Sequence, residues 1–280
     1  MFFATARQAS LRLASLAFFR LLGVVFFCCF KKRRKIAIKN IIRCLPVDHK
    51  RAKAIARKSF ISLGHTLGDF LLLPKYTKKN IDRYVSIKHL DVLKEAVASK
   101  RGVILVGAHF GSWELAAHAL ALHDLPSLIV YNKFKASCWF EGYAKRRREL
   151  SGNKLILKEQ AMLPLYKHLK IGRMATLVVD QHAHPPLGIK IPFFGIDAWT
   201  HTSFAKMSLK TGALVVPGFM FINGLFRYTI NFETIFDPDD FRDKPDPVYS
   251  MVLAFNQELE VAIKRAPEQW MWQHRRFKKV

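Results

Sequence analysis

The chain has 280 residues, half of them hydrophobic, with 46 lysine or arginine residues against 21 aspartate or glutamate residues, a formal net charge of +25. This length suffices for one domain with a full core plus an appendage, and the hydrophobic content excludes a disordered chain. So large a positive charge calls for an anionic partner: nucleic acid, an anionic membrane or an acidic protein.

The N-terminal region concentrates this charge around an apolar run. The first sixty residues hold fifteen basic residues and one acidic residue, Asp48, and they contain the run LASLAFFRLLGVVFFCCF at residues 13–30. A helix of about 18 residues spans about 27 Å, close to the thickness of a bilayer core. Arg20 interrupts the run, and KKRRK at residues 31–35 follows it. This arrangement is typical of a helix in or on a membrane, with its basic end against anionic headgroups on the cytoplasmic side.

We therefore predict a membrane-anchoring helix with a basic juxtamembrane segment at residues 1–35, and one folded domain at residues 36–280. A buried hairpin helix with a solvated basic end is the alternative for the first part. A cleaved signal peptide is disfavoured, because five basic residues and no small-residue cleavage site follow the run. The four cysteines show no C-x-x-C spacing, which argues against a zinc or disulfide framework.

Helical and strand patterns alternate through the rest of the chain. Helices are expected at residues 36–73, with a break at Pro46, and then at residues 89–101, 112–124, 135–150, 161–172, 201–212 and 247–267. Strands are expected at residues 102–110, 126–132, 154–158, 174–180, 213–221 and 226–233, and a loop at residues 181–195. The alternation predicts an α/β fold, a single domain with a mixed, mostly parallel sheet covered by helices.

The octapeptide GAHFGSWE at residues 107–114 places His109 at a strand end and Glu114 five positions later. A neutral imidazole is a general base near pH 7 when a carboxylate holds its other nitrogen. Gly111 would allow the sharp turn between them. No G-x-S-x-G motif is present, and Ser112 is interpreted as a helix cap, so the base would act on a hydroxyl of the substrate. Taken alone, the pair also fits two polar residues that flank a turn by chance.

Two further segments contain candidate binding groups. In KRRREL at residues 145–150, one arginine could point into the crevice at the strand ends and bind a phosphate or an oxyanion, or the whole run could be a solvated face. The segment at residues 178–195 contains Asp180, His182 and His184, but an H-x-H in a proline-rich loop without a second histidine cluster is poor support for a metal. An Asp-Gln pair followed by an exposed Phe-Phe-Gly better suits a substrate-binding loop.

The C-terminal segment APEQWMWQHRRFKK at residues 266–279 interleaves aromatic and basic residues. Such a segment stacks on nucleic-acid bases or lies at a membrane interface, where tryptophan anchors and arginine binds phosphate. Nucleic acid is disfavoured, because no nucleic-acid-binding module appears and the predicted anchor points to lipid.

These blocks, in this order, resemble the bacterial lipid A late acyltransferases, the lauroyl/myristoyl transferase family of the lysophospholipid acyltransferase-like superfamily. The resemblance covers nearly the whole chain. It is carried by RRKIAIKNIIRCLP, VGAHFGSWE, RRELSG, VVDQ with IPFFG, TGALVVPGF and PEQWMWQHRRFK.

The resemblance implies that residues 36–280 transfer a fatty acyl group from acyl carrier protein to a hydroxyl of a lipid A precursor, at the cytoplasmic face of the bacterial inner membrane. It implies acyl carrier protein, anionic membrane lipids and a glycolipid acceptor as partners, and neither a metal nor a cofactor besides the acyl donor. The family's H-x4-D/E motif maps onto His109 as base and Glu114 as its orienting carboxylate. The further expected catalytic residues are Arg148 and Asp180, and the expected substrate-binding residues are Gly111, Arg147, Gln181, Phe193, Phe194, Arg275 and Arg276.

The chain departs from the family pattern in two places. After Asp-Gln it has HAHPP at residues 182–186, where an Asp or Asn and glycine-rich residues are expected, and the stretch at residues 196–208 is less threonine-rich than expected. Both places touch the acceptor side, so another glycolipid, a phospholipid or an aminolipid remains an alternative acceptor. A non-enzymatic basic protein that binds membranes or nucleic acid is the last alternative, and it predicts salt-sensitive nucleic-acid binding.

Overall fold

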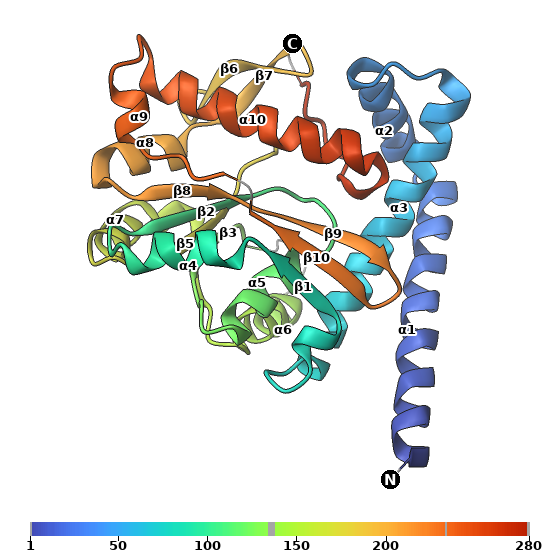
Figure 1. The fold of residues 1–280 in the computed structure, drawn as a ribbon. Helices are drawn as coiled ribbons and strands as arrows, with labels where there is room; N and C mark the ends of the chain where they lie inside the picture. The colour runs from blue at the N-terminus through green and yellow to red at the C-terminus, as the bar shows by residue number, and fades with distance from the viewer. Residues whose placement is uncertain (1, 134–137, 233, 279–280) are drawn as a thin grey trace.

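A five-stranded parallel sheet lies at the centre of the fold (Figure 1). The structure is a computed structural model that describes residues 2–133, 138–232 and 234–278, with side chains from Leu13 onward except that of Cys138. The strand order is β4 (Lys154–Leu157), β3 (Leu128–Tyr131), β5 (Met174–Val178), β2 (Val103–Gly107) and β8 (Leu214–Pro217). Every neighbouring pair is parallel, which confirms the predicted α/β architecture.

Helices cover both faces of this sheet, as its apolar strands require. One face packs against α4 (Leu90–Ala98), α5 (Trp113–Leu122) and α6 (Cys138–Glu149). The other packs against α7 (Met162–Lys170), α8 (Ser203–Thr211) and α10 (Pro247–Arg265), and the short α9 (Asp239–Arg242) precedes α10. Because the strands are buried on both sides, four of the five residues of β2 are fully enclosed.

Two smaller sheets flank the central one. In the first, β1 (Val85–Lys88) pairs parallel with β10 (Arg227–Asn231), which pairs antiparallel with β9 (Phe219–Gly224). The second is a hairpin of β6 (Gly188–Phe193) and β7 (Ile196–His201), within and just after the segment expected to be a loop. The strand expected at residues 213–221 is in fact two strands in different sheets. They part at Gly218, where a Cβ atom would lie 2.4 Å from the Phe232 ring.

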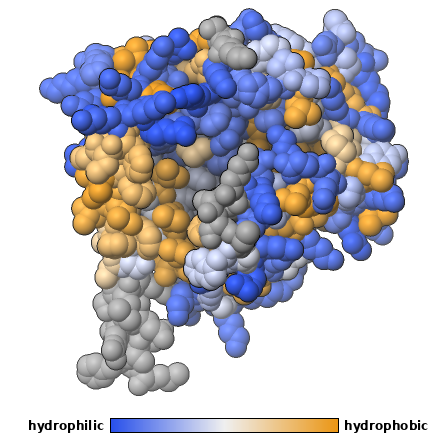
Figure 2. Space-filling view, turned by 180° about the vertical axis from the view of Figure 1, so that it is seen from behind, coloured by the Kyte–Doolittle hydropathy of each residue, from blue (hydrophilic) through white to orange (hydrophobic). Residues whose placement is uncertain are grey.

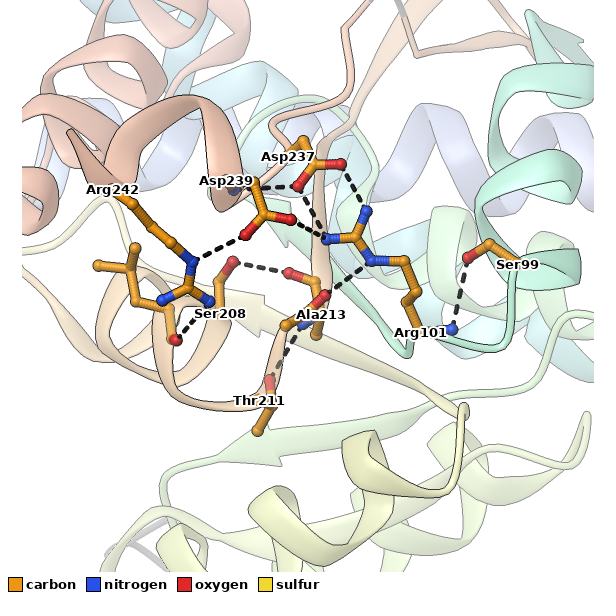
Figure 3. A network of polar contacts seen from close by, with 10 residues as sticks. Ser99, Arg101, Ser208, Thr211, Ala213, Asp237, Asp239 and Arg242 are labelled. Carbon is orange, nitrogen blue, oxygen red and sulfur yellow. Dashed lines mark hydrogen bonds and ion pairs between the residues drawn. The ribbon is translucent and has the colours of Figure 1, made fainter. Parts of the chain in front are cut away.

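An ion-pair network joins the amino ends of β2 and β8 (Figure 3). Arg101 Nη2 donates to Asp237 Oδ1 at 2.8 Å, and Arg101 Nε donates to the Gly212 carbonyl at 3.2 Å. Asp239 bridges Arg101 to Arg242. These side chains are partly exposed, so the contribution of each pair to stability is modest. The network lies at the opposite end of the strands from His109 and is structural.

Three helices from the N-terminal region lie along one side of the domain: α1 (Phe2–Cys29), α2 (Lys31–Cys44) and α3 (His49–Leu72) (Figure 1). The break between α2 and α3 falls at the expected Pro46. The expected boundary between residues 35 and 36 falls inside α2. Two glycines let α1 pack closely on α3: a Cβ atom on Gly64 would lie 2.1 Å from the Phe19 carbonyl oxygen, and one on Gly23 would lie 2.4 Å from that of Phe60.

The other side of α1 carries an apolar band. Figure 2 shows apolar side chains gathered along this helix, below a region of hydrophilic residues. Its large exposed side chains are Leu13, Phe18, Leu21, Val25 and Phe26, and Phe30 follows the helix. In the part of the chain that the structure describes, no helix taken singly has both the length and the hydropathy for a membrane span. The section of α1 from Leu13 and α2 meet that test only together, with a bend of 92° between them.

Replacing Gly64 with alanine should destabilise the protein by about 1–3 kcal/mol, because the new methyl group would push α1 away from α3. Gly142 in α6 is the matched control, since a Cβ atom there would meet no atom within 4 Å. Gly142→Ala should be neutral or slightly stabilising, because alanine is the better helix former. Thermal unfolding of the purified variants measures both effects, and equal midpoints would contradict the close packing.

Candidate active site

His109 and Asp180 meet at the carboxyl end of the central sheet. Each lies two residues beyond its strand, His109 after β2 and Asp180 after β5, and the two strands are neighbours. Their side chains are hydrogen-bonded, with His109 Nδ1 2.8 Å from Asp180 Oδ1. Crevices at this edge are where parallel α/β sheets bind ligands. The sequence placed both residues at strand ends, and the order of the strands brings them together.

Asp180 is held as a carboxylate although its side chain is only 2% exposed. Its second oxygen, Oδ2, accepts the indole N–H of Trp270 at 2.8 Å. Burial alone would raise the pKa of Asp180, but the charge and hydrogen bond of His109 and the Trp270 bond outweigh burial and keep that pKa below its ordinary value. An ionised Asp180 requires the proton on His109 Nδ1, which leaves Nε2 with the free lone pair.

The turn that carries His109 is tied to two distant segments. Gly111 has a φ of +56°, and a Cβ atom on it would lie 1.7 Å from the Met220 carbonyl oxygen, so the expected glycine bend is present. The Gly111 N–H donates to the Gln269 carbonyl at 2.9 Å, and the N–H of Met271 donates to the His109 carbonyl at 3.0 Å. Thr66 Oγ1 of α3 donates to the Gly111 carbonyl at 2.8 Å. The backbone around the imidazole is therefore rigidly positioned.

Glu114 has a different partner from the one expected. The structure gives His109 the carboxylate of Asp180, whereas Glu114 accepts hydrogen bonds from Arg148, with Nε 2.9 Å from Oε2 and Nη2 2.5 Å from Oε1. The expected His109–Glu114 contact is thus replaced by two pairs. The reason is local: Glu114 lies in the first turn of α5 and faces α6, where Arg148 lies in the last turn.

The Glu114–Arg148 pair is well enclosed, with both side chains 14% exposed. Burial acts to lower the pKa of Arg148, but the hydrogen bonds and charge of Glu114 raise it above its ordinary value. The guanidinium also lies 5.8 Å from the centre of the Phe70 ring. The pair therefore locks the start of α5 to the end of α6 beside the turn that carries His109.

Gln181 and Arg147 were also expected to bind substrate. Gln181 Nε2 lies 3.4 Å from both ring nitrogens of His109, at the outer limit of hydrogen bonding. Arg147 lies on α6 with its guanidinium 4.7 Å from the centre of the Tyr143 ring, and it lacks the contact with Glu114 that Arg148 has. Gln181 is thus placed beside the base, and Arg147 on the outer part of α6.

The predicted exposure of the Phe-Phe-Gly loop is wrong for its first residue, Phe193. Phe193 is fully buried and packs against Trp270, with ring centres 5.4 Å apart. It belongs to the core because it ends β6, whose turn into β7 begins at Phe194, a partly buried residue with a φ of +53°. In the C-terminal segment, Arg275 is exposed, whereas Arg276 is 1% exposed.

A buried polar network lies directly behind the turn that carries His109 and has no signal in the sequence. Asp69 of α3 is fully buried and accepts hydrogen bonds from Ser112 Oγ and from the Tyr228 hydroxyl, each at 2.6 Å. His65 Nε2 lies 3.0 Å from the same hydroxyl. The side chain of Ser112 therefore does not cap α5 as expected, because its hydroxyl is used by Asp69.

Asp69 should give the protein a characteristic dependence on pH. Burial raises its pKa to about 7 from 3.8, so the native state keeps a proton that the unfolded chain loses. The resulting stabilisation is complete below about pH 4 and is lost as the pH rises through about 7. The isosteric variant Asp69→Asn cannot titrate, so its unfolding free energy should increase relative to wild type over this range. Urea unfolding at about pH 4.5, 6 and 7.5 measures the difference, and a constant difference would contradict it.

One hollow contains His109, and a second lies beside it across Trp113. The first is shallow and lies between α3 and the C-terminal segment, with Ser62, Thr66 and Met271 in its wall. The other is lined almost wholly by apolar side chains of β2, α5, β5 and β9, Trp113 and Met220 among them. Trp113 borders both hollows, and its ring lies 5.1 Å from that of His109. Among the described residues, no group of three His, Cys, Asp or Glu side chains is arranged to hold a metal ion.

Comparison with known proteins identifies the family of this chain. Residues 10–279 match the family described as bacterial lipid A biosynthesis acyltransferase. The chain belongs to this family. It is therefore an acyltransferase.

Two relatives of this lipid A biosynthesis acyltransferase have modest sequence identity to it. It is 27% identical to the lipid A biosynthesis lauroyltransferase of Escherichia coli, over 92% of this chain and 83% of that protein. It is 26% identical to the lipid A biosynthesis palmitoleoyltransferase of the same organism, over 89% of this chain and 79% of that protein. A solved structure, the 1-acyl-sn-glycerophosphate acyltransferase PlsC from Thermotoga maritima, aligns with a TM-score of 0.42 and 13% identity, covering 93% of this chain and 98% of PlsC.

Proposed function

We propose that this protein transfers a fatty acyl group from acyl carrier protein to a hydroxyl of a lipid A precursor, with His109 and Asp180 as the general-base pair. The observation that carries the proposal is the 2.8 Å hydrogen bond between His109 Nδ1 and the buried Asp180 carboxylate. It directs the basic Nε2 toward the open side of the site. The original hypothesis gave the orienting role to Glu114, and the geometry favours Asp180.

The reaction is a single displacement. Nε2 of His109 removes the proton of the acceptor hydroxyl while the oxygen attacks the thioester carbonyl, so that a C–O bond forms. The tetrahedral intermediate collapses, the C–S bond breaks, and the His109 imidazolium returns the proton to the departing thiolate. Asp180 stabilises the imidazolium while it exists, as the carboxylate of a Ser-His-Asp triad does. A general base of this kind contributes about 10²–10⁴ in rate.

Arg148 and the N–H of Gly111 both already have partners, so neither is free to stabilise the oxyanion. Arg148 is paired with Glu114, and the N–H of Gly111 donates to the Gln269 carbonyl. Arg148 therefore supports this reaction by fixing the start of α5.

Three features support the choice of substrates. A hollow of about 40 Å³ beside Trp113 offers almost no polar groups, so it suits a short part of a hydrocarbon chain. A net charge of +25 suits both an acidic carrier protein and anionic lipid. The exposed apolar band of α1 lies beside a strongly basic N-terminal region, which suits the cytoplasmic face of a bacterial inner membrane.

The test is acyl transfer by the purified protein with radiolabelled acyl donors. Acyl carrier protein and coenzyme A thioesters would be compared as donors, and a lipid A precursor, a phospholipid and an aminolipid as acceptors. We expect transfer to the lipid A precursor from the carrier protein. Transfer only to one of the other lipids would assign a different acceptor. If the folded wild-type protein transferred no acyl group to any of these lipids, the proposal would be refuted.

A further inference from the structure

A group of histidines and cations lies beside His109 and has no part in the reaction above. His182 and His184 lie in the loop after β5, and His274 and Arg276 in the C-terminal segment. The rings of His182 and His184 are in edge contact, with centres 4.6 Å apart. We call these four residues the histidine–arginine cluster. His182 and His184 are also the residues in which this chain departs from the family pattern after Asp-Gln.

The cluster is held in place from several sides. The N–H of Ala183 donates to the Trp199 carbonyl of β7 at 3.2 Å. Arg276 donates from Nη1 to the same carbonyl at 2.5 Å and from Nη2 to Thr200 Oγ1 at 2.6 Å. Asn40 of α2 donates to the His274 carbonyl at 2.8 Å. The side chains of the cluster therefore project from a braced backbone.

The charge of Arg276 is poorly compensated. Its side chain is 1% exposed, its two hydrogen-bonded nitrogens meet only neutral oxygens, and its guanidinium lies 5.2 Å from the centre of the Phe193 ring. Burial lowers its pKa to about 10, against the opposing charge of Asp180. Asp180 already serves His109 and Trp270. A buried cation without its own carboxylate is rare, because the desolvation of its charge is costly.

Unused polar atoms gather at the same place. Among the described residues, Arg276 Nε and His274 Nδ1 are buried without a partner at hydrogen-bonding geometry, and the buried ring nitrogens of His182 have only the Arg276 backbone beside them as a hydrogen-bonding group. Buried polar atoms in native proteins are nearly always satisfied, so unpaired nitrogens gathered in one cluster point to a ligand site. The ligand must accept hydrogen bonds and carry negative charge, because Arg276 is a donor with a positive charge and each histidine becomes one when protonated.

We propose that the histidine–arginine cluster binds a phosphate group of one of the two substrates, next to the reacting hydroxyl and thioester. This proposal rests on the proposed function, because a phosphate group is carried by the acceptor glycolipid and by the pantetheine arm of the carrier protein. An arginine and several histidines match the several oxygens of a phosphate.

Phosphate binding at this cluster should take up protons. Burial first, and then the charge of His184, lowers the pKa of His182. The pKa of His274 is lowered to about 4, mainly by burial. The other charged or titratable groups that face the cluster are Cys44 of α2, His201 at the end of β7, Lys278 in the C-terminal segment, and the His109–Asp180 pair, and Lys158 lies behind His201. Because burial and nearby cations lower the pKa of His182 and of His274, these two imidazoles gain protons more readily once an anion is bound, so affinity should rise as the pH falls.

The first experiment measures binding of inorganic phosphate to the full-length protein by calorimetry, and follows the histidine ring resonances by NMR. We expect binding that is at least about tenfold tighter at pH 6 than at pH 8, with the signals of His182 and His184 shifting. The variant H182Q/H184Q should lose at least about tenfold in affinity and most of this pH dependence. His49→Gln, an exposed histidine at the start of α3, is the control for general attraction to a basic protein, and it should bind as wild type does.

Unchanged affinity in H182Q/H184Q, or wild-type histidine signals that phosphate leaves unmoved, would overturn the proposal. The binding readout does not depend on acyl transfer, so its failure is distinguishable from failure of the proposed function. Competition by glucosamine 1-phosphate and by 4′-phosphopantetheine separates the two sources of the phosphate. In acyl transfer, H182Q/H184Q should raise the KM of the matching substrate and leave kcat within about threefold.

Discussion

Asp180→Asn is expected to lower the rate of acyl transfer by about 10⁴-fold, the loss that the same change causes in a Ser-His-Asp triad. Asparagine fits the space of aspartate, and its oxygen still accepts the N–H of Trp270. Its amide, however, would donate to His109 Nδ1 and force the ring proton onto Nε2. The nitrogen that faces the substrate would then be unable to take the proton of the hydroxyl. Initial rates with saturating donor and acceptor measure the effect.

Further variants and a stability measurement show whether this rate loss comes from the His109–Asp180 pair. His109→Ala should abolish the same step and lose at least about 10²–10⁴ in rate, and the double variant should be no worse than the more damaged single variant, because the two residues act as one unit. The thermal midpoint of Asp180→Asn should stay near that of wild type. A variant that keeps its fold and its full rate would show that Asp180 does not orient the base.

Glu114→Gln is expected to act first on stability, with a loss on the order of 3 kcal/mol, typical of removing one partner from an enclosed ion pair. Arg148 would keep its charge in a site where only 14% of its side chain is exposed, without the carboxylate that holds two of its nitrogens. For a domain of this size the loss corresponds to a fall of roughly 5–10 °C in the unfolding midpoint.

The double variant Glu114→Gln/Arg148→Met tests whether the loss of stability comes from the charge that remains on Arg148. It removes the charge that Glu114→Gln leaves without its carboxylate, so it should recover a large part of the lost stability. If Glu114 oriented His109 directly, Glu114→Gln would instead match the rate loss of Asp180→Asn at temperatures where both variants are folded. That outcome would restore the original assignment of Glu114.

Local patterns were sufficient for most of the fold. The apolar, β-branched run at residues 102–107 is a buried parallel strand because both of its faces meet helices, and the break at Pro46 ends a helix where a proline must. Local patterns failed to predict where one apolar stretch is divided between two sheets. The continuous apolar stretch around Gly218 reads as one strand, yet it serves two sheets, and only the packing of Phe232 against Gly218 requires the division.

The sequence by itself determined the family, the α/β alternation, the glycine bend at residue 111, and the position of His109 and Asp180 after buried strands. The tertiary structure alone decided which carboxylate holds the base. H-x4-E makes Glu114 the obvious partner because it is near in sequence, but the first turn of α5 directs Glu114 toward Arg148 on α6. Parallel pairing of β2 with β5 brings Asp180 to His109 across 71 residues, and the C-terminal segment adds Trp270 from a further 90. Such contacts arise from strand order and chain return, which no local spacing encodes.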